Sequence, residues 1–219
     1  MITMKKFSFN QADKDKIKEA VASLEKATAG ELVIYFARRS DNYPGAGWKF
    51  ASLIGGTVAI IIGLLAYFWL LPAWITPLVI SIMLVSLMLL AYLLATFIPN
   101  LKLSMVAGHV IGQRVLTKAR DIFLQEEVFN TNDRIGILLF ISELEQRVVV
   151  LGDSGINKKI DKEDWKHIVD TVVLGIKHGQ TAQGIVNAVA ICQDLLLKHG
   201  FTNVEKDDNE LPDEMRIEE

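Results

Sequence analysis

The feature that most constrains this chain is a stretch, residues 50–101, without a single Asp, Glu, Lys, Arg or His. A helix on the surface of a soluble domain turns one face to water, and an uncharged stretch of this length leaves no such face. The stretch divides at Leu71-Pro72-Ala73-Trp74. As helices, residues 50–71 and 75–98 would be about 33 and 36 Å long, enough to cross a hydrocarbon core of about 30 Å. We therefore predict a two-helix transmembrane hairpin; the alternative is a hairpin buried in the core of a soluble protein.

Small residues recur along both predicted spans. They are spaced so that another helix can approach closely: Gly55, Ala59 and Gly63 on the first span, Ala91 and Ala95 on the second. These positions are predicted to pack the hairpin on itself. The alternative is that one small-residue face stays open for self-association or for a span of another membrane protein.

The charges that flank the hairpin predict its orientation. Basic residues lie on both flanks, and the loop around Pro72 has none (Arg38, Arg39, Lys49, Lys102, Arg114, Lys118, Arg120). The positive-inside rule then places both flanks, and both termini, in the cytoplasm. The first forty residues are charged and lack the early apolar run of a signal peptide. A single cysteine, Cys192, fits a reducing compartment. The expected location is the bacterial cytoplasmic membrane.

The flanks have the patterns of a mixed α/β domain. We predict helices and strands in the order helix 10–30, strand 31–37, hairpin, helix 104–129, strands 135–142 and 147–151, helices 162–177 and 181–198. The helix predicted over residues 104–129 can run on directly from the second span. Strand 31–37 is so apolar that it needs neighbours on both sides. We therefore expect residues 1–49 and 102–200 to form one discontinuous domain around the hairpin, and residues 201–219 to form an acidic, mobile tail.

Residues 130–160 carry a set of motifs that together resemble the TPM domain family, in its bacterial membrane-protein branch. The matching features are Thr131-x-Asp133-Arg134, Gly136, Ser142-x-x-Glu145-x-Arg147, Asp153-x-Gly155-Ile156 and Trp165, with Gly30-Glu31 before the first strand. The resemblance implies an α/β/α sandwich around a small sheet. It also implies two kinds of function, since some members are assigned acid phosphatase activity or calcium binding and others act as accessory proteins of membrane complexes. Many members have a signal and a separate anchor, whereas here the spans lie inside the domain.

The residues themselves offer three carboxylates for a metal site: Asp133, Asp153 and Asp161. Asp153 lies in a glycine-bracketed loop, where backbone carbonyls and carboxylates suit a hard cation such as calcium. Each also has an ordinary explanation: Asp133 in a turn, Asp153 in an Asx-turn and Asp161 as a helix cap. Nucleotide-binding, nucleophile-elbow and zinc motifs are not found. Cys192 is expected in the core. A net charge of −3 with scattered lysines excludes a nucleic-acid footprint.

Three functions fit these observations. The first is a membrane-anchored interaction or accessory module without catalysis, which the uncharged spans and the lack of a convergent site favour. The second is a divalent-metal-binding domain with phosphatase activity. The third is an accessory subunit of a transporter or envelope complex, with the hairpin as its docking element.

Overall fold

The structure, a computed structural model, describes residues 9–72, 74–131, 133–202, 211–212 and 214–218. The chain divides into two compact units. The first unit joins residues 1–40 to residues 113–219, and the second comprises residues 41–112. The sheet-forming unit is therefore discontinuous in sequence, and its boundaries fall after Ser40 and before Gln113, whereas the sequence suggested 49 and 102.

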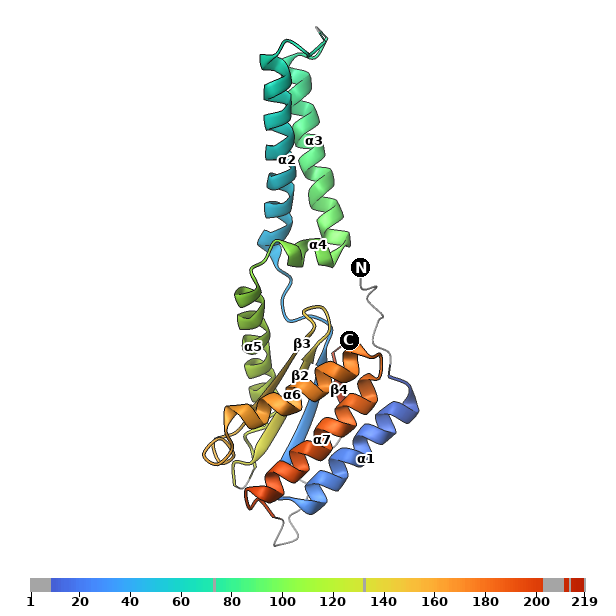
Figure 1. The fold of residues 1–219 in the computed structure, drawn as a ribbon, viewed down its shortest axis with the longest axis vertical. Helices are drawn as coiled ribbons and strands as arrows, with labels where there is room; N and C mark the ends of the chain where they lie inside the picture. Colours follow the sequence, from blue (N-terminus) through green and yellow to red (C-terminus); the bar gives the residue numbers. More distant parts are fainter. Residues whose placement is uncertain (1–8, 73, 132, 203–210, 213, 219) are drawn as a thin grey trace. The chain divides into compact units, whose positions relative to one another are not determined.

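A four-stranded mixed sheet forms the centre of the first unit, in the order β3-β2-β1-β4 (Figure 1). Its strands are β1 (Glu31–Ala37), β2 (Gly136–Ser142), β3 (Arg147–Gly152) and β4 (Arg216–Ile217). β1 pairs with β2 in parallel over all seven residues of each strand, and β2 pairs with β3 as an antiparallel hairpin. Both neighbours of β1 are parallel to it. The predicted apolar strand thus has neighbours on both sides, as its composition required.

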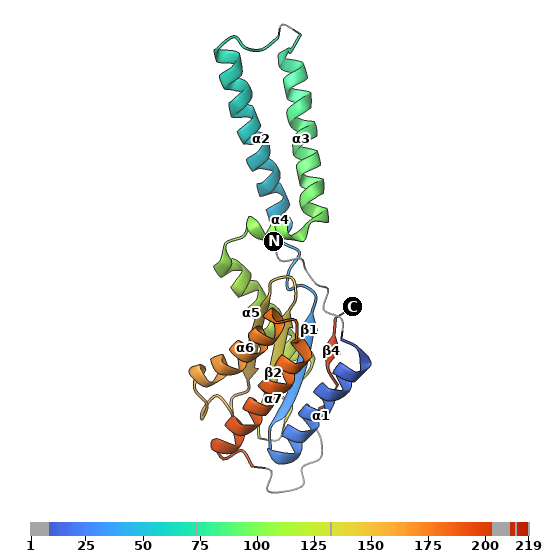
Figure 2. The same cartoon turned by 45° about the vertical axis from the view of Figure 1, so that its right-hand side comes forward.

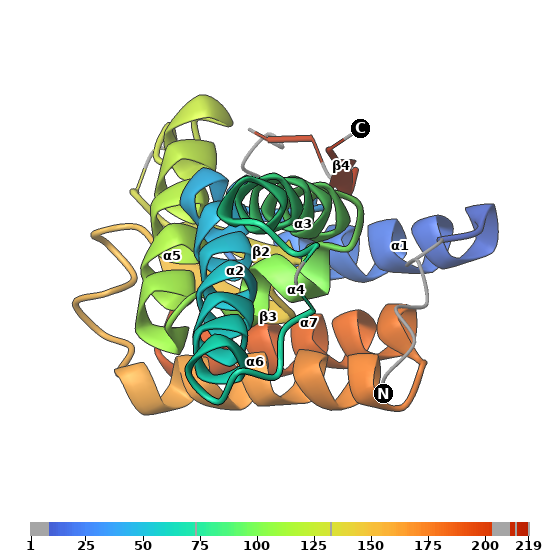
Figure 3. The same ribbon diagram turned by 90° about the horizontal axis from the view of Figure 1, so that it is seen from above.

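Helices cover both faces of this sheet (Figure 3). Three of them pack on one face: α1 (Gln11–Ala27), α6 (Lys162–Lys177) and α7 (Thr181–Lys198). On the other face lies α5 (Gly108–Gln125), whose Val115, Ala119 and Ile122 are buried. Alternation along β1 separates the two layers, because Leu32, Ile34 and Phe36 join the α1–α6–α7 core while Tyr35 faces α5.

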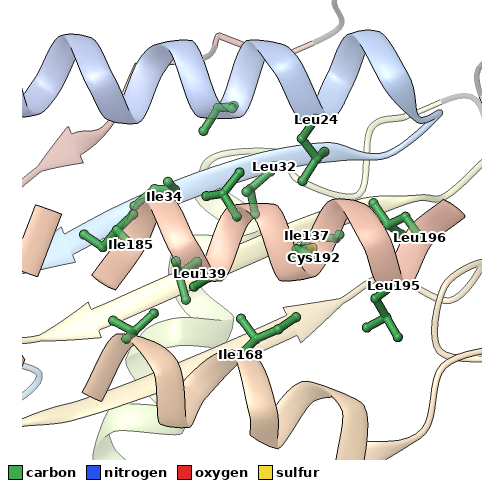
Figure 4. Packing of buried hydrophobic residues seen from close by; sticks show 14 of the residues in the cluster. Leu24, Leu32, Ile34, Ile137, Leu139, Ile168, Ile185, Cys192, Leu195 and Leu196 are labelled. Carbon is green, nitrogen blue, oxygen red and sulfur yellow. The ribbon is translucent and has the colours of Figure 1, made fainter. Parts of the chain in front are cut away.

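The larger core lies between α1, α6, α7 and the sheet (Figure 4). Ile17, Val21 and Leu24 form the buried stripe of α1, spaced three and four residues apart as predicted. The Asn10 side chain accepts a hydrogen bond from Asp13 N–H at 2.7 Å and completes a capping box with Asp13, so the start of this helix is fixed locally. Helices α6 and α7 approach closely at two glycines, where a Cβ on Gly175 would lie 2.5 Å from the Cα of Gly184.

The second unit is a helical hairpin with a short third helix. It consists of α2 (Pro44–Tyr67), α3 (Pro77–Phe97) and α4 (Pro99–Ser104), with α2 and α3 side by side in Figures 1 and 2. Both long helices are of membrane-spanning length and composition, and only 11% of each apolar window is buried. Trp48 stacks on Tyr92 with ring centroids 4.5 Å apart. The hairpin is therefore held by contacts near its open end, while most of its apolar side chains point outward.

Three details differ from the sequence prediction. The first long helix begins at Pro44, before the predicted start of the span at residue 50, because Tyr43 adopts the left-handed conformation (φ 46°) and Pro44 takes the first helical position. The helix predicted over 104–129 is shorter and does not continue from the second span: Pro99 starts the separate helix α4. A fourth strand, β4, forms at Arg216–Ile217, where the sequence suggested a mobile tail. Most of that predicted tail, residues 203–210, 213 and 219, lies outside the described residues.

Candidate functional site

Two polar clusters lie at opposite ends of β2. The first, which we call the Arg134–Asp153 cluster, joins the turn before β2 to the loop after β3. The second, the Glu145 cluster, consists of Ser40, Ser142 and Glu145 and joins the end of β1 to the β2–β3 turn. Because β1 and β2 are parallel, the Glu145 cluster lies at the carboxyl ends of both strands, where ligands of α/β sheets commonly bind.

The turn before β2 is built by its own hydrogen bonds. The Thr131 hydroxyl accepts from the backbone N–H of Ile135 at 3.0 Å, and the Thr131 carbonyl accepts from Arg134 N–H at 3.2 Å. Arg134 takes the left-handed conformation with φ 57°. Gly155 N–H donates to the Arg134 carbonyl at 3.0 Å, and the backbone is so close that a Cβ at Gly155 would collide with the carbonyl of Asp133. Close packing of the two backbone segments therefore explains the glycine in the Asp153-x-Gly155 motif.

Asp153 forms an ion pair with Arg134. The Arg134 Nε lies 2.6 Å from Asp153 Oδ2, and Nη2 donates to Oδ1 at 3.2 Å. The Asp153 side chain is 6% exposed and that of Arg134 53%. The guanidinium also lies over the Phe129 ring, 5.6 Å from its centroid. The carboxylate is thus neutralised by a cation that the chain itself supplies, so a metal ion bound at Asp153 would have to displace Arg134.

The three predicted metal ligands occupy different surroundings. Asp153 is buried in its ion pair, whereas Asp133 and Asp161 are exposed. Asp161 holds the N-cap position of α6 as predicted, but its side chain makes no capping hydrogen bond. Among the residues that the structure describes, no three His, Cys, Asp or Glu side chains gather in a group that could hold a metal ion. The geometry therefore gives no support to a calcium site built from these three carboxylates.

The Glu145 cluster is a chain of hydroxyl and carboxylate groups in which Ser142 and Glu145 are buried and Ser40 is half-buried. Ser40 N–H donates to both carboxylate oxygens of Glu145, at 3.0 and 3.1 Å, and the Ser142 hydroxyl donates to Glu145 Oε2. The hydroxyls of Ser40 and Ser142 lie 2.8 Å apart. Ser142 is 1% exposed and Glu145 8%. A serine beside a carboxylate resembles a nucleophile with its base, but a hydroxyl buried this deeply is closed to a substrate, so the cluster anchors the end of β1.

Sequence reasoning found only part of this second cluster. Ser142 and Glu145 were singled out as a motif without a role, and their three-residue spacing is the signal of a local side-chain bond. Ser40 was not singled out. Its backbone N–H reaches Glu145 across 105 positions of sequence, and no local pattern reports a bond of that range.

On the α5 face, Tyr35 lies among four charged groups that sequence reasoning did not bring together. Burial raises the pKa of Tyr35 above its ordinary value, and Glu218 raises it further while Lys118 lowers it. The pKa of Lys118 is raised by its hydrogen bond to Glu218, against the opposing effect of burial. The Lys118 Nζ donates to Glu218 Oε1 at 2.9 Å. The C-terminal segment therefore brings its own charges to this face of the sheet.

Cys192 has a structural role. Its thiol is 3% exposed in the core, and burial raises its pKa to about 12. A thiol with so high a pKa stays protonated and is a poor nucleophile. The neighbouring cavity, lined by apolar side chains that include Leu32, Ile168 and Cys192, has a volume of only 10 Å³. A ligand larger than a single water does not fit there.

The predicted helix-packing residues divide into two groups. Gly55, Ala91 and Ala95 are buried between α2 and α3, and a Cβ on Gly55 would lie 2.6 Å from Met88 Cγ. Ala59 is exposed, and nothing lies within 4 Å of a Cβ placed on Gly63. The close contact between the two helices therefore uses only the first part of the small-residue series on α2.

Comparison with known proteins agrees with the motifs. Residues 107–195 match the family model of the TPM domain, which covers less than half of the chain and spans most of the region from α5 to α7. No curated protein matches. The solved structure of the BA42 protein from the psychrophilic bacterium Bizionia argentinensis is similar, with a TM-score of 0.60 and 17% sequence identity over 100% of both chains. At this identity the likeness concerns the fold alone. In residues 107–195, this chain thus matches the TPM domain family.

Proposed function

We propose that this protein is a membrane-anchored interaction or accessory module without catalysis, acting at the cytoplasmic surface of a bacterial membrane. The observation that carries the proposal is the outward direction of the apolar side chains on α2 and α3. Ile60 is 67% exposed, Leu78 70% and Phe97 79%. Exposing a large apolar side chain to water costs about 1.5–3 kcal/mol relative to burying it, and a hydrocarbon environment removes that cost.

The polar groups of the hairpin also suit a lipid environment. Each of three hydroxyls in the long helices donates to the backbone carbonyl four residues earlier: Thr57 to Leu53, Ser81 to Pro77 and Thr96 to Tyr92. A hydroxyl satisfied within its own helix needs no water. The uncharged stretch 50–101 then fits two spans, with the basic flanks in the cytoplasm and the loop around Pro72 outside.

The absence of catalysis is proposed from the two clusters. Asp153 is paired with Arg134, and the hydroxyl of Ser142 is buried. The competing proposal is a divalent-metal-dependent phosphatase, in keeping with the word phosphatase in the name of the matching family model. A full-length preparation in detergent, assayed with a generic phosphomonoester and calcium, magnesium or manganese, separates the two proposals. Turnover that disappears in Asp153→Ala but not in Asp161→Ala would overturn the non-catalytic assignment.

One observation favours an accessory role in a transporter or envelope complex. Ala59 and the space above Gly63 are open on α2, so another span could approach there closely. Photocrosslinkers placed near Gly63 in native membranes are expected to capture another membrane protein, and Gly63→Leu to abolish the capture. Gly45→Leu is the control, because a Cβ at Gly45 also meets nothing within 4 Å but lies at the other end of α2.

The topology is tested by paired reporters. A periplasm-active phosphatase fused after Trp74 is expected to be active, and the same reporter fused after Arg120 to be inactive. A cytoplasm-active fluorescent reporter should give the opposite pattern. Equal activity at both positions would show that the hairpin does not cross the membrane.

A further inference from the structure

The C-terminal residues 214–218, here called the strap, lie along the edge of β1. Arg216 and Ile217 pair in parallel with Tyr35 and Phe36, and Glu218 N–H donates to the Phe36 carbonyl at 2.9 Å. Met215 packs against the core that α1 covers. A short segment distant in sequence is thus accommodated as an added strand, so the edge of β1 at Tyr35 and Phe36 accepts a strand.

The side chains of the strap alternate between the two faces of the sheet. Arg216 and Glu218 face α5, while Ile217, between them, is the register partner of Phe36 on the opposite face. The Arg216 Nε lies 2.5 Å from Glu126 Oε2, and the Lys118 Nζ lies 2.9 Å from Glu218 Oε1. Helix α5 and the turn that follows it therefore present a base and an acid that select the pattern basic–apolar–acidic in an added strand.

The strap is held by few strong contacts. In the described part of the tail, it pairs with only two of the seven residues of β1. Its three ion pairs are at least a fifth exposed on every side chain, and the outermost, Lys18 with Glu214, is 52% and 75% exposed. Arg216 Nη1 is buried without an acceptor among the described residues. Exposed pairs contribute little net stability, so the strap is suited to exchange.

We propose that this edge, formed by Tyr35 and Phe36 of β1 with Lys118 of α5 and Glu126 just after it, is a strand-binding site for a basic–apolar–acidic segment of a partner protein. The strap is its occupant within the chain. The proposal rests on the interaction function proposed above and names the chemistry of the partner. The Leu32 N–H, farther along β1, donates to the Glu25 carboxylate at 3.2 Å. A partner strand that extends past Tyr35 exchanges this side-chain bond for backbone pairing that the strap does not make.

A partner protein is favoured over a second copy of the chain. The strap of a second copy is identical, so exchange between copies forms the same contacts. Each chain also holds its own strap close to the site, at a high effective concentration. The strap of a second copy must compete with it, although it makes no additional hydrogen bond. A longer segment of another protein can gain bonds and so compete.

The test uses the full chain in detergent and a fluorescent peptide, Leu-Pro-Asp-Glu-Met-Arg-Ile-Glu, corresponding to residues 211–218. In the variant Arg216→Glu with Glu218→Arg, the strap no longer complements α5 and leaves the site. The peptide is expected to bind this variant several-fold more tightly than the wild-type chain, because the reversed strap meets like charges and no longer competes for the site. Equal binding to the two chains would overturn the proposal.

A matched variant reverses the site instead of the strap. In Lys118→Glu with Glu126→Lys, a peptide carrying the same two charge reversals as the strap variant should bind, and the natural peptide should not. Equal affinity of the natural and the charge-reversed peptide for this variant would show that charge does not select the strand. Glu218→Gln removes one ion pair without reversing a charge and should give intermediate binding, so the series stays decisive where a reversed variant fails to fold.

One further readout tests the choice of a partner protein over a second copy. Dimers that form in wild-type chain and exchange their straps would assign the site to a second copy and overturn the choice of a partner protein. Peptide binding in detergent is independent of the reporter experiment on topology. A failed topology therefore refutes the membrane function alone, and failed peptide binding refutes the strand site alone.

Discussion

The two units treat similar apolar side chains differently: the sheet unit buries them, and the hairpin exposes them. In the sheet unit, Phe140 and Ile137 are 0% exposed, whereas in the hairpin Phe97 is 79% and Ile60 67% exposed. The sheet unit gains stability by removing such side chains from water itself, whereas the hairpin leaves most of its own exposed. Apolar composition alone therefore does not predict burial within the protein, and in the function proposed here lipid would cover the exposed side chains of the hairpin.

The largest difference between the units is expected from truncating an apolar side chain. Phe140→Ala should lower the free energy of unfolding of the sheet unit by about 3–5 kcal/mol, because it leaves a cavity in a closed core. Leu64→Ala, at a position 55% exposed on α2, should leave the stability of that unit unchanged. Denaturant titration of the full chain in micelles, followed by near-ultraviolet circular dichroism, measures both. Equal losses would mean that the sheet unit depends on the hairpin.

Glycine substitutions test how closely the helices pack in each unit. Gly175→Ala should cost about 1–3 kcal/mol, because the new Cβ meets the backbone of Gly184 and neither helix can yield easily. Gly63→Ala should instead stabilise its helix by up to about 1 kcal/mol, since the new Cβ meets nothing. Thermal unfolding checks the first, and helix content in micelles the second. A tolerated Gly175→Ala would show that α6 and α7 can move apart.

The Arg134–Asp153 pair gives a smaller effect. Asp153→Asn should cost about 1–2 kcal/mol, less than a fully buried pair, because the Arg134 side chain is 53% exposed and returns partly to water. Asp161→Asn is the matched control and should be neutral, since the Asp161 side chain makes no capping bond. Denaturant midpoints compare the two. Added calcium that stabilises the wild-type chain but not Asp153→Asn would revive a metal role for Asp153.

The smallest effect concerns pH. The pKa values of Tyr35 and Lys118 are both raised above their ordinary values of 10.0 and 10.5. A folded state that holds protons more tightly is stabilised below those ordinary values and loses the contribution as the pH rises through the raised pKa. Alkaline pH should therefore weaken the sheet unit by less than about 1 kcal/mol. Glu218→Gln should reduce this dependence, and an unchanged profile would mean that the strap does not contact Lys118.

Local patterns predicted most of the sheet unit. The period of Ile17, Val21 and Leu24, the apolar run of β1 and the turn between β2 and β3 are all readable over a few residues. Local patterns do not predict the strap. Arg216 and Ile217 form a strand only because β1 offers an edge and Lys118 and Glu126 offer two opposite charges. A two-residue strand has no period of its own.

The small-residue series on α2 failed for a geometric reason. A helix turns through about 100° per residue, so each step of four residues moves a side chain about 40° around the axis. Gly55 faces α3, and Ala59 and Gly63 rotate progressively away from it. The sequence does not indicate the Arg134–Asp153 pair because the two residues belong to separate motifs, and it is the pairing of β2 with β3 that brings their loops together.

The position of the hairpin between β1 and β2 also has a consequence for biosynthesis. The ribosome makes β1 first, and its parallel partner β2 emerges about a hundred residues later, a delay of roughly 5–20 s at ordinary rates of elongation. During that time the strand Glu-Leu-Val-Ile-Tyr-Phe-Ala has no sheet to join. Insertion of the hairpin, if it occurs as proposed, would fall within the same interval. On that proposal, the nascent chain would have to protect an apolar strand while its next segment entered the bilayer, and the sheet would close only after that step.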